Sequence, residues 1–406
     1  MDRRRTGSHG LLLPLVFIIL ATLASAVMAY GTHPSWAQYS HGLDLILWTR
    51  RLQWPLITFA MVMCIALLVL IISGKRRAWW LIGLAPVLAL FAHKFHVKPG
   101  TELNIAESPA MVSADAATFL QDGTYVVGLT MDDEAYAFPY PVLFNTPGVI
   151  VQNREKKLML IWSAYANRAV ASTVELDLHA RDLEVVSTPA NSVLIYNSRL
   201  GQFIVGVTGR TDRGDVPSGF HAPVQVTKTT WSHWRSAHPQ SQVMLPLAVA
   251  SPPIFAPPTG PILPQFAMPN VSTGVDPKTR VAVIQSVLPA AVVADALTDA
   301  PANLSFGDEP VLLLRDGPGG PIRAYDRRID GDLFVRLKPY HNTKKPLVLF
   351  ADDSSNSLWS RGIVAIEGGP EVKGKKLMRI PVEEDLYWGV MKYWYKDLQL
   401  YRPVPD

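Results

Sequence analysis

The chain carries LLLPLVFIILATLASAVMAY at residues 11–30 and PLITFAMVMCIALLVLIIS at residues 55–73. At about 1.5 Å per residue, a helix of this length covers the roughly 30 Å hydrocarbon core of a bilayer, so both stretches predict membrane-spanning helices. A third stretch, AWWLIGLAPVLALFA at residues 78–92, is shorter and contains Pro86, so a short span competes with an interfacial helix. We expect it to span, because Trp79 and Trp80 place an aromatic belt at one end.

Basic residues set the predicted orientation. Arg3, Arg4 and Arg5 precede the first stretch, and Lys75, Arg76 and Arg77 separate the second from the third. Both clusters stay on the cytoplasmic side only if all three helices cross, which places the remainder of the chain outside. Arg50 and Arg51 lie in the outer loop and oppose this orientation, unless they lie along the interface with their guanidinium groups in water. Residues 11–30 also fit a cleaved signal peptide, but their length favours an uncleaved anchor.

Charge and cysteine content narrow the class of protein. Residues 1–98 hold 10 of the 38 Lys and Arg residues but only 2 of the 34 Asp and Glu residues, which leaves 28 basic and 32 acidic residues beyond them. A mildly acidic domain lacks the positive surface that phosphate backbones need, so we expect no nucleic acid partner. The only cysteine, Cys64, lies in the second apolar stretch, so the domain has neither disulfides nor a cysteine metal site.

The domain after the apolar region reads mainly as short strands. Between residues 124 and 210, runs such as TYVVGLTM, GVIVQN, KLMLIW and SVLIYNS are rich in β-branched and aromatic residues and are broken by turn residues. Two segments favour helices, residues 113–120 with Ser113 as N-cap and residues 229–237. Residues 246–277 hold nine prolines and predict an extended linker.

After this linker the pattern of the first half starts again. TYVVGLTMDDEAYAFPYPVL resembles TRVAVIQSVLPAAVVADALT, and LMLIWSAYANRAV resembles VLLLRDGPGGPIRAY. VLIYNSRLGQFIVG then aligns with VLFADDSSNSLWSRG, and TTWSHWRSAHPQSQVML with EDLYWGVMKYWYKDLQLY. The matches keep the same order in both halves, which predicts a duplicated β-rich ectodomain of two related halves, residues 96–245 and 278–406. The predicted fold class is thus mainly β (α+β), behind a three-helix membrane anchor at residues 1–95.

Over residues 106–402 the chain resembles the bacterial domain-of-unknown-function family 3179. The segments that carry the resemblance are SADAATFL, DEAYAFPYPVL, VIVQN, VLIYNSRLG, TTWSHWRSAHP, YDRRIDG and NSLWS. The resemblance implies a Cys-Pro-Leu-Cys turn after LMLIW, where this chain has Ser163-Ala164-Tyr165-Ala166. Ser163 and Ala166 therefore occupy the lost cysteine positions, and the turn cannot bind metal or cycle through a disulfide as paired thiols would. The family's activity is not established, so the resemblance implies architecture and no substrate.

The best polar constellation lies in the second half. Asp326 and Arg327 occur in YDRRIDG, and Asp352 and Asp353 shortly precede Trp359. Paired carboxylates could hold a cation or share a proton, and an arginine would bind an anionic group. The alternative, which we favour, is that YDRRIDGDLF forms a hairpin with its turn at Gly331 and that ADDSSNS is a solvated loop.

Histidines and glycines offer weaker candidates. His93 and His96 could present two imidazoles to a metal, but capping of the third helix at the interface fits them better. His233 and His238 suggest acid–base chemistry, but the surrounding sequence better fits a helix that buries its tryptophans. DGPGG at residues 316–320 lacks the glycine spacing and the Lys-Ser/Thr of a phosphate loop and predicts a turn.

From these features we expect a multi-pass protein of the bacterial inner membrane with its large C-terminal domain extracytoplasmic. Loss of the family's cysteines favours a non-catalytic binding or assembly module, an accessory subunit that needs the bilayer and a protein partner but no cofactor. The alternative is an enzyme or a small-ligand or metal-binding protein that uses the constellation of the second half. A transporter is disfavoured, because the three apolar stretches contain no ionisable residue of the kind that lines a substrate path.

Overall fold

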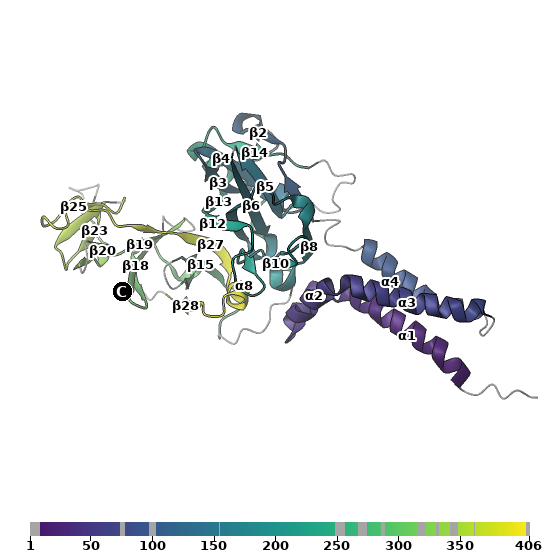
Figure 1. Ribbon diagram of the computed structural model, residues 1–406. Helices are drawn as coiled ribbons and strands as arrows, with labels where there is room; N and C mark the ends of the chain where they lie inside the picture. Colours follow the sequence, from purple (N-terminus) through teal and green to yellow (C-terminus); the bar gives the residue numbers. More distant parts are fainter. Residues whose placement is uncertain are drawn as a thin grey trace, which may run out of the picture. The chain divides into compact units, whose positions relative to one another are not determined.

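The structure, a computed structural model, contains an N-terminal region of apolar helices followed by β-rich regions (Figure 1). The chain divides into two compact units, residues 1–269 and 270–406. The structure describes residues 9–73, 78–96, 103–153, 155–247, 256–266, 274–285, 289–315, 321–329, 333–341, 348–360 and 362–402. The basic clusters at residues 3–5 and 75–77, the DGPGG segment and Gly331 lie outside the described residues.

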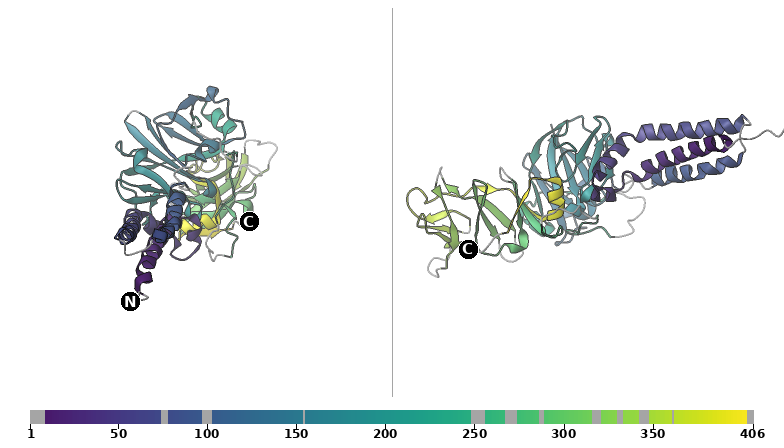
Figure 2. Two further views of the ribbon diagram at one scale, coloured as in Figure 1. Left: turned by 90° about the vertical axis from the view of Figure 1, so that its right-hand side faces the viewer. Right: turned by 90° about the horizontal axis from the view of Figure 1, so that it is seen from below.

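Among the residues that the structure describes, three helical segments are long and apolar enough to cross a membrane, judged by length and composition: Leu12–Tyr30, Gln53–Ile72 and Ala78–His96. They correspond to α1 (His9–Tyr30), to α3 (Gln53–Ile72), and to the 3₁₀ helix η2 (Ala78–Leu84) together with α4 (Ala85–His96). Helix α1 lies beside α3 and α4 (Figures 1 and 2). The third segment changes from 3₁₀ to α-helix just before Pro86, because proline is accepted in the first turn of an α-helix but not in its interior.

A helical connection joins α1 to α3. It consists of the 3₁₀ helix η1 (Pro34–Gln38) and α2 (Gly42–Arg51). Asp44 lies in the first turn of α2 and Arg50 and Arg51 in its last turn, an arrangement that the helix dipole favours. Gly42 is required where α2 begins, because a Cβ atom there would lie 1.7 Å from the carbonyl oxygen of Trp36.

The described residues of the first unit form three sheets. Their strands follow the orders β1-β5-β6-β7-β12, β13-β3-β4-β14-β2 and β11-β10-β9-β8. The strand bounds are β1 (Ile105–Glu107), β2 (Met111–Ser113), β3 (Tyr125–Met131), β4 (Glu134–Pro139), β5 (Gly148–Asn153), β6 (Lys156–Ser163), β7 (Arg168–Val174), β8 (Leu183–Ser187), β9 (Leu194–Asn197), β10 (Gln202–Val205), β11 (Arg210–Thr211), β12 (Phe220–Val224), β13 (Val226–Thr230) and β14 (Gln242–Met244).

Strand β6 lies in the middle of this stack and is buried on both faces. Leu160 and Trp162 pack into a core shared with β3 and β4, whereas Met159 and Ile161 pack into a second core shared with β9 and β10. Because successive side chains of a strand point to opposite faces, an uninterrupted apolar run suits a strand covered on both sides. The sheet that contains β6 is therefore the middle layer of three.

Helix α7 (Trp231–Ala237) covers the outer face of the β3–β4 sheet. Trp231 and Trp234 are buried there against Val126 and Ala137. A Cβ atom on Gly128 would lie 2.2 Å from the Trp234 ring, so the indole packs directly on the backbone of β3. This packing confirms the interpretation of the WSHW segment as a helix that buries its tryptophans.

The second unit also contains stacked sheets. Their orders are β27-β15-β16-β28, β17-β18-β19-β26 and β22-β23-β24-β25, with a small β20-β21 ribbon. The strand bounds are β15 (Arg280–Ile284), β16 (Ala290–Val293), β17 (Ala302–Phe306), β18 (Glu309–Arg315), β19 (Ile322–Asp326), β20 (Arg328–Ile329), β21 (Leu333–Phe334), β22 (Leu337–Pro339), β23 (Val348–Asp352), β24 (Ser357–Ser360), β25 (Ala365–Glu367), β26 (Arg379–Ile380), β27 (Val382–Tyr387) and β28 (Gln399–Tyr401).

In the second unit, the sheet that contains β18 is likewise covered by other strands on both faces. Val311 and Leu313 pack with β15 and β16, whereas Leu312 and Leu314 pack with the sheet that contains β23 and β24. Helix α8 (Trp388–Trp394) follows β27, and its Trp388 is 1% exposed.

A partly buried ion pair connects the edge strand β1 to β6. Glu107 accepts a hydrogen bond from Nζ of Lys157 at 2.7 Å, and Lys157 is 2% exposed. His179 lies 2.9 Å from the same carboxylate oxygen, and the amide of Ala180 donates to the other one at 2.9 Å. Burial opposes ionisation of Glu107, but these donors and the lysine charge outweigh it and lower the pKa of the carboxyl to about 2.

Several local predictions are confirmed and one is wrong. The four runs predicted as strands form β3, β5, β6 and β9, and β20 pairs antiparallel with β21 as the predicted YDRRIDGDLF hairpin requires. The helix predicted at residues 113–120 is only a three-residue 3₁₀ turn, Ala114–Ala116, and Ser113 makes no side-chain capping bond. Tertiary packing overrides local propensity here, because Ala114 and Ala117 are drawn onto the core beneath α7.

Candidate functional site

The structure places the predicted polar residues of the second unit in two separate groups. Asp326 and Arg327 lie at the end of β19, whereas Asp352 and Asp353 begin the turn between β23 and β24. Trp359 lies in β24 and is fully buried in the core. Asp326 is held by Arg328, whereas the partners of Asp352 include residues of its own turn.

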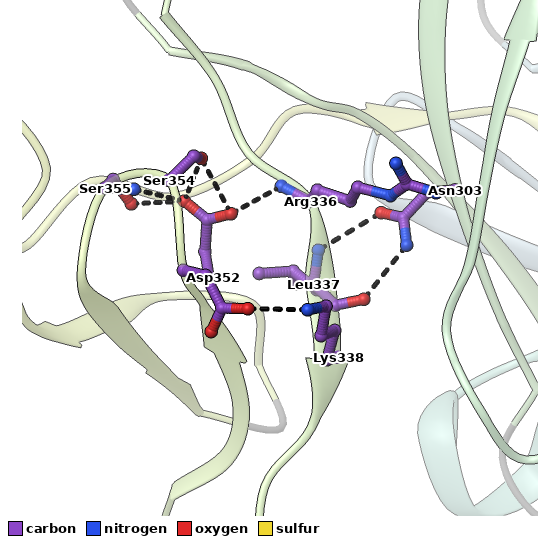
Figure 3. A network of polar contacts seen from close by, with 8 residues as sticks. Asn303, Arg336, Leu337, Lys338, Asp352, Ser354 and Ser355 are labelled. Atoms are coloured by element: carbon purple, nitrogen blue, oxygen red, sulfur yellow. Dashed lines mark hydrogen bonds and ion pairs between the residues drawn. The ribbon is translucent and has the colours of Figure 1, made fainter. Parts of the chain in front are cut away.

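Asp352 is the centre of a polar network around this turn (Figure 3). Its Oδ1 accepts a hydrogen bond from the amide of Arg336 at 2.8 Å and from the hydroxyl of Ser354 at 2.9 Å. Its Oδ2 accepts from the amide of Ser355 at 2.9 Å and from the hydroxyls of Ser354 and Ser355. The residue is 2% exposed, so its carboxylate is held by groups of the chain itself.

The network continues into the core. The Ser355 hydroxyl lies 2.6 Å from the Ser357 hydroxyl, which accepts the indole N–H of Trp359 at 2.7 Å. Burial opposes ionisation of Asp352, but the hydrogen bonds from Ser355, the Arg336 amide and Ser354 outweigh it and lower the pKa of its carboxyl. A carboxylate held in this way is stabilised as an anion and is poorly suited to give or take a proton near neutral pH.

The hairpin between β9 and β10 in the first unit has a turn of the same length, with Asn197 in place of Asp352. Asn197 occupies the position of Asp352: it pairs with Gln202 across the hairpin as Asp352 pairs with Ser357. Its Oδ1 accepts hydrogen bonds from the backbone amides of Arg199 at 3.1 Å and of Leu200 at 3.2 Å. Because an amide side chain cannot ionise, the shared role of the two positions is to fix a turn.

The remaining members of the predicted constellation are also engaged within the chain. Arg328 binds Asp326 with its Nε 2.9 Å from Oδ2. Arg327 donates to the carbonyl oxygens of Val335 at 3.3 Å and Leu304 at 3.1 Å. The exposed Asp353 pairs with Lys338 at 2.5 Å. Ligand binding by these residues remains a prediction.

The predicted histidines take part in ring contacts. The His93 ring lies 5.0 Å from the Tyr30 ring, and the His238 ring lies 4.1 Å from that of Trp234. Within the described residues no group of three or more His, Cys, Asp or Glu could hold a metal ion.

The turn at Ser163–Ala166 is buried at both ends and is bonded to a neighbouring loop. Ser163 and Ala166 are both fully buried. The Ser163 hydroxyl accepts the amide of Val193 at 3.1 Å. Asn167, in the left-handed conformation after the turn, accepts the hydroxyl of Tyr140 at 2.7 Å. The turn therefore has a fixed shape without sulfur.

A cavity of about 650 Å³ lies beside this turn, inside the first unit. Trp162, Ala164 and Tyr165 form one wall, next to Tyr30 at the end of α1 and His93 of α4. We call this space the anchor cavity. Sequence reasoning missed it, because its walls come from segments that are far apart in the chain and carry no motif.

The family model described as a protein of unknown function, DUF3179, matches residues 104–397. The chain belongs to this family. No curated protein and no solved structure matches it. DUF3179 membership confirms the resemblance drawn from the residues. The turn where that resemblance implies two cysteines is therefore the one that borders the anchor cavity of this DUF3179 chain.

Replacing Asp352 tests its role as a turn residue. We expect Asp352→Ala to lower the free energy of unfolding by about 2–4 kcal/mol, because it leaves several buried donors without an acceptor. Asp352→Asn should cost less, because one acceptor oxygen remains. Chemical denaturation of the full chain in detergent, followed by tryptophan fluorescence, measures both, with the exposed Asp353→Asn as control.

The stabilisation that Asp352 contributes should decrease as the pH falls. Because the folded-state pKa of Asp352 is lowered, its stabilisation is complete above the unfolded value of about 3.9 and disappears as the pH falls through the folded value. The difference between wild type and Asp352→Ala should therefore shrink below about pH 4. If Asp352→Ala were as stable as wild type or more stable, Asp352 would not stabilise the fold, and its role in fixing the turn would be refuted. That result would indicate a carboxylate that is kept for binding at a cost in stability.

Proposed function

We propose that the protein is a membrane-anchored, extracytoplasmic binding and assembly module without catalytic activity of its own. Its three apolar helices carry side chains that are exposed in the structure: Leu12 is 61% exposed, Ile72 82% and Ile82 74%. Large apolar surfaces of this kind suit contact with lipid. The module would be an accessory subunit of a membrane or envelope complex, held in a bacterial inner membrane by these helices.

The observation that carries the proposal is how α2 docks on the sheet β11-β10-β9-β8. Nη2 of Arg50 lies 2.7 Å from Oε2 of Glu184, and Nη2 of Arg51 lies 2.9 Å from Oδ2 of Asp212. The Arg50 guanidinium also lies 4.2 Å from the centre of the Tyr196 ring. These two arginines were the sequence evidence against an outer position for this loop. Pairing with carboxylates of the β-rich domain gives them a reason to lie there.

Thr32 makes a second connection between the helices and the sheets. Its carbonyl oxygen accepts the hydroxyl of Ser187, in β8, at 2.7 Å. Its own hydroxyl accepts a hydrogen bond from Nζ of Lys94, in α4, at 3.3 Å. The ends of α1 and α4 and the start of α3 are therefore all near the β-rich domain, which supports three crossings with the domain on one side.

We also propose that the two β-rich regions arose by duplication. In the first unit β3 pairs with β4, antiparallel β13 and parallel β14 extend this pair, and α7 joins β13 to β14. In the second unit β15, β16, β27, β28 and α8 repeat this pattern. The amide of Trp231 donates to the carbonyl of Thr124 at 2.7 Å, as that of Trp388 does to Thr279 at 2.9 Å.

The duplication supports binding over catalysis. The hairpin turn of the second unit holds an ionisable Asp352 where that of the first holds Asn197, yet the backbone geometry is shared, with a left-handed residue at Asn356 and at Gly201. What the halves have in common is thus a scaffold. The alternative, an enzyme or a ligand- or metal-binding site in the second half, needs Asp352 to leave its internal partners.

Cysteine accessibility tests the anchor and its orientation. In a Cys64→Ala background, which removes the only cysteine, we expect Asp353→Cys to react with a membrane-impermeant maleimide in intact spheroplasts. Ser73→Cys, at the opposite end of α3 from α2, should react only after permeabilisation. Both positions are exposed, so neither result depends on unfolding. The reverse labelling pattern, or equal labelling of both positions, would contradict the proposed topology.

The assembly role has a separate test. We expect gentle detergent extraction from the native membrane, followed by crosslinking and mass spectrometry, to recover a second protein at fixed stoichiometry. Arg235→Ala, at an exposed ion pair with Asp122, serves as a control that should not alter recovery. Recovery of the chain alone after crosslinking would count against an accessory subunit and leave the anchoring result unaffected.

A further inference from the structure

We propose that the anchor cavity binds a neutral, flat, carbonyl-bearing ring compound of quinone type that reaches it from the bilayer. This inference rests on the proposed membrane anchoring and names a ligand class for the binding module. It concerns binding alone and includes no reaction. Its support comes from the size of the cavity, its aromatic walls, one buried donor and the position of the walls in the chain.

The cavity has the size and lining of a ligand site. Its volume of about 650 Å³ lies within the range of roughly 300–1,000 Å³ that is usual for small-molecule sites. Rings line much of the wall: Tyr165 lies 6.2 Å from Phe144 and 6.0 Å from Phe266, edge-on in both pairs, and Tyr30 lies 5.0 Å from His93. Walls of this kind accept a flat ring by stacked or edge-to-face contact.

The donor is the indole N–H of Trp162. This side chain is 1% exposed and lines the cavity, and its Nε1 has no hydrogen-bond partner among the described residues. A buried N–H without an acceptor is unfavourable, and buried indoles usually find a partner. A carbonyl oxygen is an acceptor without a hydrogen of its own and would satisfy this donor.

The lining also argues for a neutral ligand. Within the described part of the chain, the residues around the cavity include no Lys, Arg, Asp or Glu. Among the described lining residues, only His33 and His93 could carry a positive charge, so a charged headgroup would lose its hydration and gain no permanently charged counter-ion, which is costly. A neutral ring with one or two carbonyl oxygens would lose little hydration.

The position of the walls points to entry from the bilayer. Tyr30 ends the first apolar segment and His93 lies near the end of the third. Asn191, which also lines the cavity, lies in an unusual stretch of backbone: Ala190 and Asn191 are both left-handed, with φ of 45° and 65°. Asn191 uses its side chain to bind both backbone groups of Phe266, at 2.9 and 3.1 Å. Left-handed non-glycine residues of this kind cluster at binding sites.

Paired probes test the proposal. Duroquinone and durene share one carbon skeleton, and only duroquinone carries carbonyl oxygens. We expect equilibrium dialysis of the full chain in nanodiscs against empty nanodiscs to show specific binding of both probes. Trp162→Phe should weaken duroquinone binding about fivefold, the effect of one neutral hydrogen bond, and leave durene binding unchanged. Trp234→Phe is the matched control, because that indole is already bonded to Ser241 and does not line the cavity.

A second variant pair tests the location independently of the hydrogen bond. Ala164→Trp, which fills the cavity, should abolish binding of both probes, whereas Ala116→Trp, at an exposed position in the same unit, should not. Duroquinone binding that is absent from wild type, or that survives Ala164→Trp, would overturn the proposal. Binding of methyl decanoate but not of duroquinone, with the same Trp162 dependence, would show an acyl ester site and overturn the ring assignment. Dialysis measures binding whichever way the chain is oriented in the nanodisc. Failure of the cysteine labelling test would therefore contradict the proposed topology without changing the binding result.

Discussion

The structure of the first unit depends on two arginine side chains at the end of α2 that pair with carboxylates, and one of them, Arg50, is largely buried. The side chain of Arg50 is only 11% exposed, and a buried guanidinium is tolerated only beside a carboxylate or another strong acceptor. Glu184 and Asp212 supply the carboxylates, and Tyr196 and Phe203 supply aromatic faces. This docking holds the connection between α1 and α3 against the sheet. The segment at Tyr30–His33 thereby becomes a wall of the anchor cavity, so this docking positions both the apolar helices and the cavity.

Much of the fold could be predicted from the sequence, because its signals are local. Residue composition alone marks the apolar helices, and alternation and turn residues mark β3, β5, β6 and β9. The three-residue turn at Ala114–Ala116 could not be predicted, because contact with the core beneath α7 decides its length. The KLMLIW run predicted only that β6 is a strand, because which sheets cover its two faces depends on long-range pairing.

The candidate sites show a sharper limit. Sequence reasoning selected Asp352 and Trp359 from their residue types, and the structure joins them through Ser355 and Ser357. The same network satisfies them internally, which no sequence pattern could reveal. Conversely, Trp162 and Tyr165 belong to a segment that drew attention only through the cysteines it lacks. Their common cavity with Tyr30 and His93 brings together segments that lie between 69 and 135 positions apart, so it could not be predicted from the sequence.

Charge reversal at the docking pair tests the central claim most directly. We would measure hydrogen–deuterium exchange of residues 31–52 in nanodiscs for Arg50→Glu, for Glu184→Arg and for the double reversal. The account predicts faster exchange in each single variant, because like charges then face each other across the interface, and recovery of most protection in the double variant. Exchange in the single variants equal to that of wild type would show that α2 is not held on the sheet by this pair. The account of a β-rich module docked on its apolar helices, with a cavity lined by both, would then be contradicted.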